Sequence, residues 1–516
     1  MLREDEGNDA CDGSDESSDE KTAFLGSRHS AHSEIRGSPG ARQPCCQTRH
    51  VLAFISFLGF SIVYALRVNL SVAMVVMVNH TSSSETTNSK VCPVPWHNVS
   101  QPAVAPKGPQ YNWDSKTQGW ILGAFFYGYI VTQIPGGYLA DRYGGKLLFG
   151  LGITCTWLFT LLTPIAAEMG VFYLILVRFL EGLGEGVTFP TMHAMWAKWA
   201  PPLERSQLIS FSYAGSYFGT VVALPLSGVL ADTLGWPYIF YICGSVGVFW
   251  SLGWYLLAFD SPKKHPYISA IELKYIQSSL HSTQSSQKPQ RVPWLEMSRS
   301  GPVWAICISY FCYSWGFYTL LNCMPMYMND ILHFSIEENG FLSALPYLFS
   351  WVVMVGSGLL ADWLCRRKVF STTTVRKMFT LFGLGGPSLF LIAVCYVGCN
   401  SKLAVTFLTL SLVAGALSGS GNSINHLDIA PQFAGILLGI SNSFATIPGF
   451  LAPLAVGYLT SNHTLPEWQN VFYIASAVSV FGAVFFMFFG SGKIQKWATL
   501  DSIPCAKASG FLQKLK

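Results

Sequence analysis

The sequence predicts an all-α membrane protein with twelve transmembrane helices. Of its 516 residues, 51% are hydrophobic and 12% are charged, against about 25% charged in an average soluble domain. Apolar runs of about 20 residues, the length that crosses a bilayer as a helix, recur along the chain. They begin near Val51, Thr117, Leu147, Phe172, Gln207, Trp236, Val303, Asn339, Met378, Leu403, Gly435 and Val471. Most of the chain is therefore expected to lie among membrane lipids.

Polar segments divide these spans into two sets of six. The first residues carry the acidic, Ser-rich stretch EDEGNDACDGSDESSDE, whose composition predicts disorder. No secretory signal peptide precedes the first span, which is expected to act as its own insertion signal. The expected segments, in order, are a cytosolic tail (1–50), an N-terminal six-helix half (51–259) with a lumenal loop at about 80–115, a cytosolic linker (260–302), a C-terminal six-helix half (303–490) and a second cytosolic tail (491–516).

Two independent patterns predict a cytosolic N-terminus. The loops on that side carry many basic residues, as the positive-inside rule requires, whereas the opposite loops carry only Lys90, Lys107, Lys116 and Lys402. The sequons at Asn79, Asn98 and Asn462 are expected to be glycosylated, and glycosylation needs a lumenal or extracellular site. All three fall in loops that the charge pattern places on that outer side.

Four charged residues interrupt the apolar spans and indicate function. Arg178, Glu181 and Glu185 lie in the fourth span, and at 100° per residue they share one helix face within about 60°. Arg67, in the first span, is expected at a depth comparable with Arg178. A charge at the centre of a bilayer costs about 2.5–3.5 kcal/mol on insertion scales, and ion pairs stabilise poorly compared with apolar packing. These four residues are therefore predicted to bind substrate and couple protons.

The residue types suggest how such a site works. Arginine binds a carboxylate through two hydrogen bonds and keeps its charge, so Arg67 and Arg178 are predicted to hold an anionic substrate. In an acidic compartment Glu185 is expected to take a proton and release Arg178, with Glu181 relaying the proton or shaping the site. The aromatic residues predicted to line the cavity are Tyr64, Phe126, Tyr127 and Tyr318.

An internal repeat links the two halves. At a constant offset of 221 residues, Gly119 aligns with Gly340 and Asp141 with Asp362, which indicates a duplicated six-helix unit around one binding cavity. The first copy ends in GGYLADRYGGK, which resembles the cytosolic loop signature of the major facilitator superfamily. The resemblance implies the fold of that superfamily, with two rocking halves. It also implies gating by ion pairs of Asp141, Arg142, Lys146 and, in the second copy, Asp362.

Longer stretches of the sequence resemble one family within this superfamily. FSIVYALRVNLSVA, TQGWILGAFFYGYIVTQIPGGYLAD, RFLEGLGEGVTFPTMHAMWAKWAPPLERS and SINHLDIAPQFAGILLGISNSFATIPG resemble the lysosomal sialic acid transporters of the anion-cation symporter family. This resemblance implies proton-coupled export of sialic acid and other acidic monosaccharides from lysosomes, with aspartate, glutamate or nitrate as further substrates. By the same pattern, Arg67 and Arg178 bind the carboxylate, and Glu181 and Glu185 couple protons. Leu122 replaces the histidine of the vesicular glutamate transporters.

The tails and loops predict the cellular location of the protein and its partners. Lysosomal members carry an acidic dileucine signal that binds clathrin adaptors, and the nearest match here is Glu20 with Phe24 and Leu25. A lysosomal membrane is expected, with the plasma membrane and synaptic vesicles as other locations. Protons are the expected coupling ion, and no other cofactor is expected. The net charge of +4 is concentrated in cytosolic loops, so no nucleic-acid partner is expected.

Three functions other than a symporter of this kind are alternatives for such a chain. A sodium-coupled organic anion or phosphate transporter at the plasma membrane remains open, as does an anion channel, in which paired arginines would form a constriction. The intramembrane glutamates and the two-fold repeat favour the symporter over the channel. An enzyme is not expected, because the chain contains neither H-E-x-x-H nor G-x-S-x-G.

Overall fold

The computed structural model describes residues 47–79, 108–201, 204–284 and 292–498, and the helices below all belong to the unit Thr48–Lys516. The described residues are almost entirely helical, and a single isolated bridge joins Val78 to Tyr111. We call the end of the bundle at which the first long helix begins the inner end, and the opposite end the outer end. The inner end is the one that the charge pattern predicts to be cytosolic.

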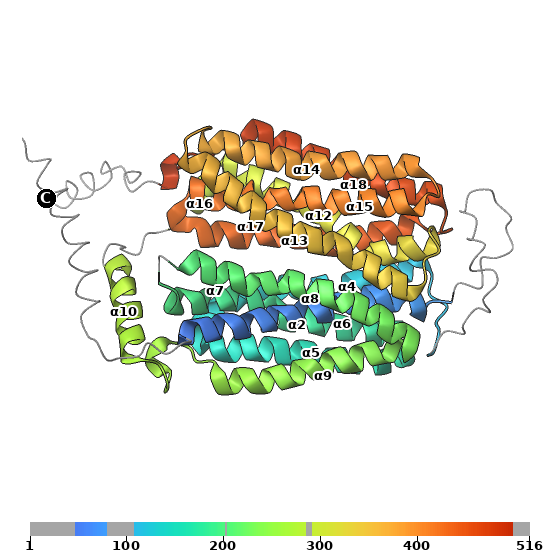
Figure 1. The fold of residues 1–516 in the computed structure, drawn as a ribbon, viewed down its shortest axis with the longest axis horizontal. Coiled ribbons are helices and arrows are strands. Elements are labelled where there is room, and N and C mark those ends of the chain that lie inside the picture. Colours follow the sequence, from blue (N-terminus) through green and yellow to red (C-terminus); the bar gives the residue numbers. More distant parts are fainter. Residues whose placement is uncertain (1–46, 80–107, 202–203, 285–291, 499–516) are drawn as a thin grey trace, which may run out of the picture. The chain divides into compact units, whose positions relative to one another are not determined.

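The first half of the chain forms six spans (Figure 1). One of them, the fourth, is broken at Val187 into two helices. The helices are α2 (Thr48–Met77), α4 (Ser115–Tyr143), α5 (Gly145–Met169), α6 (Val171–Gly186) followed by α7 (Thr188–Trp199), α8 (Arg205–Thr233) and α9 (Trp236–Leu257).

The second half repeats this pattern, and here the tenth span is interrupted. Its helices are α12 (Gly301–Asp330), α13 (Ile336–Arg366), α14 (Thr372–Val397), α15 (Ser401–Gly415) continued by η3 (Ala416–Ser420) and α16 (Asn425–Ile429), then η4 (Pro431–Phe433), α17 (Ala434–Leu459) and α18 (Leu465–Phe489). Within the described residues, nine helical segments are long and apolar enough to cross a membrane. Helices α4, α12 and the α6–α7 pair supply the other three spans, so the prediction of twelve is confirmed.

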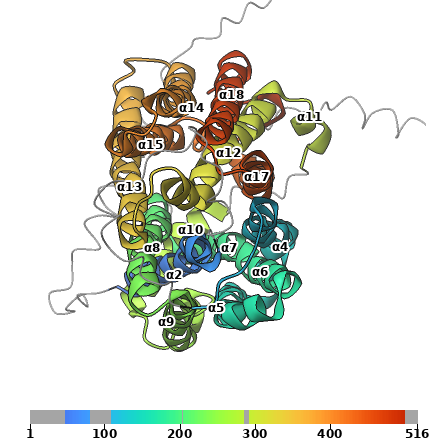
Figure 2. The ribbon, with the colours of Figure 1, turned by 90° about the vertical axis from the view of Figure 1, so that its right-hand side faces the viewer.

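The two halves form two layers that meet along two seams (Figures 1 and 2). Helix α4 packs against α17 along one seam, and α8 packs against α13 along the other. Glycines bring the backbones together at the outer end. A Cβ at Gly119 would lie 2.6 Å from the carbonyl oxygen of Pro453, and one at Gly340 would lie 2.7 Å from that of Leu224. The halves are therefore closed against each other at the outer end.

Open space lies beside the inner parts of two helices that form these seams. Gly356 and Gly358 of α13 and Gly435 and Gly439 of α17 have no neighbouring atom within 4 Å of the position of a Cβ. Of the hydrogen bonds described across the α4–α17 seam, the one nearest the inner end joins Gln133 to Thr446 at 3.4 Å. The backbones of the two halves therefore pack closely only in the outer part of the described seams.

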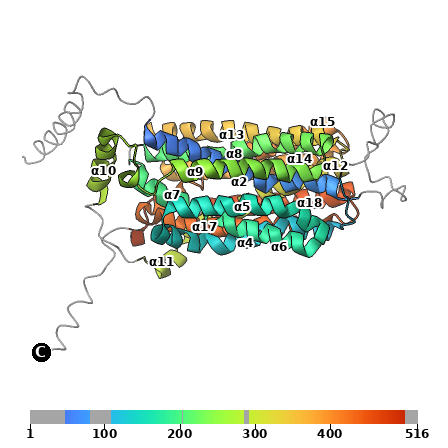
Figure 3. The same cartoon turned by 90° about the horizontal axis from the view of Figure 1, so that it is seen from below.

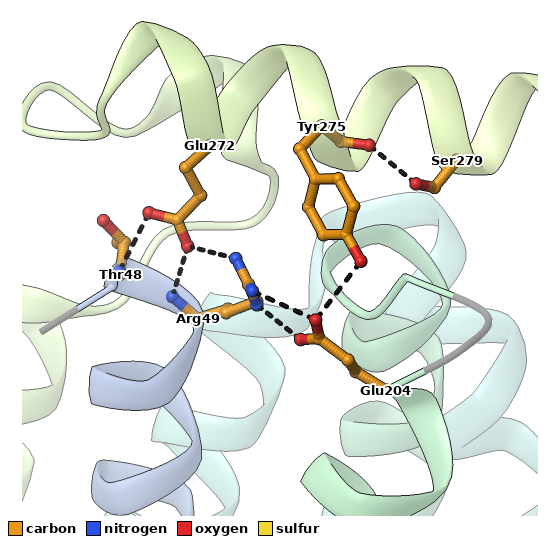
Figure 4. A network of polar contacts seen from close by, with 6 residues as sticks. All are labelled: Thr48, Arg49, Glu204, Glu272, Tyr275 and Ser279. Carbon is orange, nitrogen blue, oxygen red and sulfur yellow. Dashed lines mark hydrogen bonds and ion pairs between the residues drawn. The ribbon is translucent and has the colours of Figure 1, made fainter. Parts of the chain in front are cut away.

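The linker between the halves contains helices that the sequence analysis did not predict. They are η2 (Pro262–Lys264), α10 (Ala270–Gln284) and α11 (Trp294–Ser298), and α10 lies beyond the inner ends of the spans (Figure 3). Arg49, at the start of α2, joins α10 to the first half, as Figure 4 shows. Its Nε donates to Glu204 at 2.8 Å and its Nη1 donates to Glu272 of α10 at 3.3 Å. Tyr275 of α10 also donates to Glu204, at 3.2 Å.

The disulfide state of one cysteine bears on the orientation of the chain. Cys399, just past the outer end of α14, is disulfide-bonded, whereas Cys155, Cys243 and Cys323 are free and lie inside the spans. Disulfides persist in oxidising compartments such as the secretory lumen. The outer side, which the basic loops predict to be lumenal, is the side on which such a bond would persist.

Candidate functional site

A glycine run in α6 brings the charged residues next to α4. Gly182 and Gly186 press against the backbone of α4 at Phe125 and Tyr129, and Gly128 of α4 presses against Phe179 in return. Glycine allows this approach because it has no Cβ, as at other helix contacts in membranes. Helix α6 is therefore held against α4, and its charged residues contact Arg67 of α2 and Thr160 of α5.

The four charged residues form two buried ion pairs. Arg67 of α2 donates from Nη2 to Glu185 Oε1, and Arg178 donates from Nη1 to Glu181 Oε2 at 2.7 Å. None of these side chains is more than 3% exposed. Arg178 Nη2 also donates to the carbonyl oxygen of Arg67 at 3.4 Å, which ties the two pairs together.

This pairing differs from the sequence-based hypothesis that Glu185 holds Arg178. Seven residues along a helix correspond to a rise of about 10 Å, whereas three residues correspond to about 4.5 Å and suit a direct side-chain pair. Arg178 therefore pairs with Glu181 on its own helix, and Glu185 pairs across to Arg67. A proton on Glu185 would accordingly release Arg67 rather than Arg178.

Aromatic rings enclose the Arg67 guanidinium. Its Cζ lies 4.5 Å from the ring centre of Tyr64, 4.9 Å from that of Phe125, 5.0 Å from that of Tyr129 and 5.9 Å from that of Phe126. Such contacts contribute about 2 kcal/mol or more when the cation is desolvated. The rings offset part of the desolvation of Arg67, whose Nε has no hydrogen-bond partner among the described residues.

The structure brings most of the predicted aromatic residues together. Tyr64 and Phe126 contact Arg67, and Tyr318 of the second half packs on Phe126 with ring centres 4.7 Å apart. Tyr127 points elsewhere, because it is one residue on from Phe126 and about 100° away around α4. Its ring stacks on Phe450 of α17 at 4.5 Å, within the α4–α17 seam.

Three residues of the site were missed by the sequence analysis. Phe125 and Tyr129 line Arg67, and Phe125 also lies under Arg178 at 5.5 Å. Thr160 of α5 donates to Glu181 Oε1 at 3.1 Å. The i, i+4 spacing of Phe125 and Tyr129 could have predicted them, because it places both side chains on one face of the helix. That face is close to Gly128, which contacts α6. Thr160 carried no such signal.

Several polar atoms of the site have no hydrogen-bond partner within the described part of the chain. They are Nε of Arg67, Nε of Arg178 and Oε2 of Glu185. Buried polar atoms are normally paired, so these atoms are available to a substrate or to water. No group of three or more His, Cys, Asp or Glu residues that could hold a metal ion occurs among the described residues.

The predicted gating residues lie at the inner ends of α4, α5 and α13. The Lys146 amide donates to Asp260 at 2.8 Å, which joins the start of α5 to the segment after α9. Arg142 donates to the Tyr138 hydroxyl at 3.5 Å, and Asp362 is exposed. The side chain of Asp141 lies outside the described residues. Gating by ion pairs between these residues stays a prediction.

The predicted glycosylation and sorting sites are only partly described. Asn79 follows the outer end of α2, and Asn462 is exposed in the outer loop between α17 and α18. Asn98 lies outside the described residues, as do the sorting residues Glu20, Phe24 and Leu25. The two described sequons thus lie at the same end of the bundle, as the charge pattern predicts.

Comparison with known proteins identifies relatives that share most of this chain. A family model described as Major Facilitator Superfamily matches residues 50–453. The chain is 54% identical over 473 residues to sialin of Homo sapiens, covering 90% of this chain and 94% of that protein. It is 40% identical over 486 residues to vesicular glutamate transporter 2 of Homo sapiens, covering 92% and 81%.

Solved structures share the fold at low identity. A bacterial homolog of the human lysosomal transporter Spinster, inward-facing and occupied, superposes with a TM-score of 0.66 at 14% identity, covering 87% of this chain and 97% of that one. A D-xylose-proton symporter superposes with a TM-score of 0.64 at 16% identity, covering 87% and 99%. The chain therefore belongs to the Major Facilitator Superfamily and, within it, to the group of membrane transporters that contains sialin and the vesicular glutamate transporters.

Proposed function

We propose that this protein is a proton-coupled symporter that carries sialic acid and other acidic monosaccharides from the lumen of the lysosome to the cytosol. It moves its substrate unchanged, without catalysing a reaction. The outer end of the bundle faces the lumen, and the closed outer seams correspond to the state that releases substrate to the cytosol. Its 54% identity to sialin over 90% of the chain supports this assignment.

The observation that carries the mechanism is the charge balance of the buried quartet. Two arginines and two glutamates sum to zero, and both arginines are already paired. A carboxylate that binds an arginine must displace a glutamate, which then remains buried without its partner. An unpaired buried charge is strongly unfavourable, whereas a proton on that glutamate restores neutrality. One anion therefore enters together with one proton.

The surroundings of the site suit an acidic sugar. The free Nε atoms of Arg67 and Arg178 give each guanidinium a further donor, and a guanidinium with two donors on one side binds a carboxylate in bidentate fashion. Aromatic rings from both halves, including Tyr64 and Tyr318, adjoin the arginines. Flat apolar rings and hydroxyl groups together can pack a pyranose ring and hydrogen-bond its substituents.

Aspartate and glutamate are further proposed substrates. The chain is 40% identical to vesicular glutamate transporter 2 over 92% of its length. A dicarboxylic amino acid would engage the same two arginines, because each carboxylate is a planar anion that suits the guanidinium. The order of preference between acidic sugars and acidic amino acids is decided by competition in the assay below.

The proposed location is the lysosomal membrane. Clathrin adaptors that bind the tail at Glu20, Phe24 and Leu25 are the proposed route to it. Replacing Phe24 and Leu25 with alanine is expected to move the protein to the cell surface, as measured by surface biotinylation. If that variant stays in the lysosome, another segment carries the sorting signal.

The transport function is tested with purified protein in proteoliposomes. Uptake of labelled N-acetylneuraminic acid is measured at external pH 5.5 and 7.4 with the interior at pH 7.4, in the presence and absence of sodium. Saturable uptake that is stimulated by acid and independent of sodium supports the symporter. Sodium-dependent uptake would favour the sodium-coupled alternative, and unsaturable uptake that follows voltage would favour a channel. Unlabelled aspartate and glutamate serve as competitors.

A further inference from the structure

Helix α13 lies at the edge of the bundle (Figure 2) and carries a continuous apolar stripe on its outside. The exposed side chains of the stripe recur at steps of three and four residues, so they lie within about 80° of one another around the helix. They are Leu345, Leu348, Val352, Val355, Leu359 and Trp363. The stripe is about 27 Å long, which is close to the thickness of the hydrocarbon core of a bilayer. It is therefore the face of α13 that contacts lipid.

Three exposed cations follow this stripe at the inner end of α13. They are Arg366, Arg367 and Lys368, and Arg366 lies on the same helix face as Leu359, seven residues earlier. Trp363, about one turn before the first two cations, is of the residue type that is enriched at the boundary between membrane and water. The cations are therefore placed at the level of the lipid headgroups on the inner side. We call residues 366–370 the basic turn.

The backbone of the basic turn has a defined shape that costs free energy. Lys368 has a positive φ of 53°. Its amide donates to the carbonyl oxygen of Cys365 at 3.2 Å, and the amide of Val369 donates to that of Leu364 at 3.2 Å. Glycine is the usual residue in this helix-ending motif, because a side chain disfavours the left-handed region. Lysine holds the position at a conformational cost, which indicates a use for its side chain.

The corresponding turn in the first half differs in two respects. The internal repeat aligns Asp141 with Asp362, and the residue with positive φ after Asp141 is a glycine, Gly144. A carboxylate also covers that turn, because Asp260 accepts a hydrogen bond from the Lys146 amide at 2.8 Å. None of the ion pairs formed among the described residues includes a residue of the basic turn. Its three positive charges are therefore available to a partner outside the chain.

Apolar side chains next to the cations favour a membrane lipid over a soluble anion as that partner. Val369 and Phe370 are 49% and 44% exposed and directly follow Lys368. At a membrane surface, apolar side chains enter the boundary between headgroups and acyl chains, while neighbouring cations attract anionic lipids. The surrounding sequence opposes this attraction little, because Asp362 is the only acidic residue between positions 359 and 377.

We propose that the basic turn binds the headgroup of a phosphoinositide in the leaflet on the inner side of the membrane. A guanidinium binds a phosphate through two parallel hydrogen bonds, and a lysine adds a point charge. A phosphate monoester carries a charge of about −1.5 to −2 near pH 7, so two arginines and a lysine suit it better than the single net charge of phosphatidylserine. The bound lipid holds the inner end of α13, the helix that packs against α8 at one seam. The site is independent of the substrate that the protein carries.

Binding is measured with purified full-length protein in a neutral detergent. The probe is a short-chain phosphatidylinositol 4-phosphate with a fluorophore on one acyl chain, and its fluorescence anisotropy gives an apparent dissociation constant. Replacing Arg366, Arg367 and Lys368 together with glutamine is expected to weaken binding roughly a hundredfold. This corresponds to about fivefold, or about 1 kcal/mol, for each cation near an anionic lipid surface. No saturable binding to the wild type, or wild-type affinity in this variant, would overturn the proposal.

Lys368→Gly separates the charge of the basic turn from its shape. Glycine removes the cost of the positive φ, so this variant is expected to unfold at or above the wild-type temperature. Its affinity for the probe is nevertheless expected to fall about fivefold. It therefore gives a result even where the triple variant does not fold. Wild-type affinity in Lys368→Gly would overturn the proposal, because the lysine would then hold its strained position without binding the lipid.

A matched variant removes three exposed cations from the inner end of the first half. Lys198, Lys263 and Lys264 are all exposed, and replacing them together with glutamine changes the net charge by the same amount. This variant is expected to bind the probe as the wild type does. A loss of affinity equal to that of the first triple variant would overturn the proposal, because the attraction would then belong to the positive inner end as a whole.

Unlabelled competitors identify the class of ligand. Phosphatidylinositol 4-phosphate is expected to displace the probe at lower concentrations than phosphatidylserine or the soluble headgroup inositol 1,4-bisphosphate. Equal displacement by phosphatidylserine would overturn the assignment to a phosphoinositide, and equal displacement by the soluble headgroup would overturn the assignment to a membrane lipid. These measurements involve no uptake, so a failure of the proposed function would leave their outcome unchanged.

Discussion

His463 and Asp330 form an ion pair at the outer end of the bundle, with Nδ1 of His463 lying 2.7 Å from Oδ2 of Asp330. The other ring nitrogen of His463 lies 3.1 Å from Ser115 Oγ. Ser115 begins α4, whereas Asp330 ends α12 and His463 precedes α18. The histidine therefore connects the two halves across the α4–α17 seam, where Ser115 also donates to the carbonyl oxygen of Thr460 at 3.0 Å.

This pair predicts that outer closure depends on pH. The hydrogen bond to Asp330 raises the pKa of His463 above its ordinary value of 6.5, and Glu467 adds to the effect despite partial burial. A raised pKa means that the closed state gains stability that is fully present below pH 6.5 and is lost as the pH rises through the raised value. The outer end is therefore expected to be closed more of the time at pH 5.5 than at pH 8.

Spin labels at exposed Leu234 and Glu337, one on each half, measure this closure as a distance at the outer end. The wild type is expected to show a larger long-distance fraction at pH 8 than at pH 5.5. His463→Gln removes the titrating group and is expected to abolish the difference. His463→Lys keeps a positive charge across this range and is expected to stay closed at both values. A pH response that persists in His463→Gln would contradict the assignment.

Arg49 is predicted to stabilise the attachment of α10 to the first half. Its side chain is 7% exposed and donates to both Glu204 and Glu272, and the Glu272 side chain is 4% exposed. Arg49→Gln leaves two carboxylates without their cation, which is expected to reduce stability by about 1–3 kcal/mol. A lower thermal unfolding temperature in detergent, measured by the fluorescence of buried tryptophans, is the expected result.

A surface pair on the same linker provides the control. Lys264 lies 4.0 Å from Asp260 and its side chain is 71% exposed. Exposed pairs of this kind contribute little to stability. Lys264→Ala is therefore expected to unfold at the wild-type temperature. Equal effects of the Arg49 and Lys264 substitutions would show that the Arg49 network acts as an ordinary surface ion pair.

The fold was predictable because its main signals are local. Runs of about 20 apolar residues mark spans wherever they occur, and the repeat around Asp141 and Asp362 indicated the two halves. Helix α10 was missed because its sequence, AIELKYIQSSLHSTQ, is too short and too polar to form a span, although Leu273, Ile276 and Leu280 repeat at helical spacing. It is held by Arg49 and Glu204, which are distant in the sequence.

The site was predictable as a set of residues but not as a set of contacts. Charges inside apolar spans identified Arg67, Arg178, Glu181 and Glu185 without any structure. The Arg178–Glu181 pair follows from an i, i+3 spacing on one helix, whereas the Arg67–Glu185 pair depends on the separation and rotation of α2 and α6, which the sequence does not encode locally. Tyr127 was grouped with Phe126 although the 100° step along a helix separates their side chains, and Thr160, an unremarkable residue in an apolar helix, was missed.

The close contact between α4 and α6 predicts a severe effect of a small substitution. A Cβ at Gly182 would collide with the carbonyl oxygen of Phe125, and backbone cannot move aside as a flexible side chain can. Gly182→Ala is expected to destabilise the protein by about 1–3 kcal/mol through overpacking and to displace the Arg178 pair. The thermal unfolding temperature and the rate of uptake are both expected to be lower than in the wild type.

Glycines beside open space offer the matched substitution. Gly253 of α9 and Gly439 of α17 have no atom within 4 Å of the position of a Cβ. Alanine is favoured over glycine in a helix by about 1 kcal/mol. Gly253→Ala and Gly439→Ala are therefore expected to leave the unfolding temperature unchanged or raise it. A Gly182→Ala protein with wild-type stability and uptake would mean that α4 and α6 can separate freely.

The Arg67–Glu185 pair makes it possible to separate stability from transport. Arg67→Gln leaves Glu185 buried without a cation, and Glu185→Gln leaves Arg67 without its carboxylate, so each single variant is expected to unfold at a lower temperature. The double variant Arg67→Gln with Glu185→Gln removes both charges and is expected to recover much of that loss. It lacks the guanidinium that binds substrate, and a hydrogen bond to a charged group contributes about 1.5–3 kcal/mol, so its uptake is expected to fall roughly ten- to a hundredfold.

The measurement is a double-mutant cycle of unfolding temperature and of initial uptake rate in proteoliposomes. Recovery of both quantities in the double variant would show that the pair only stabilises the fold and that the substrate carboxylate binds elsewhere.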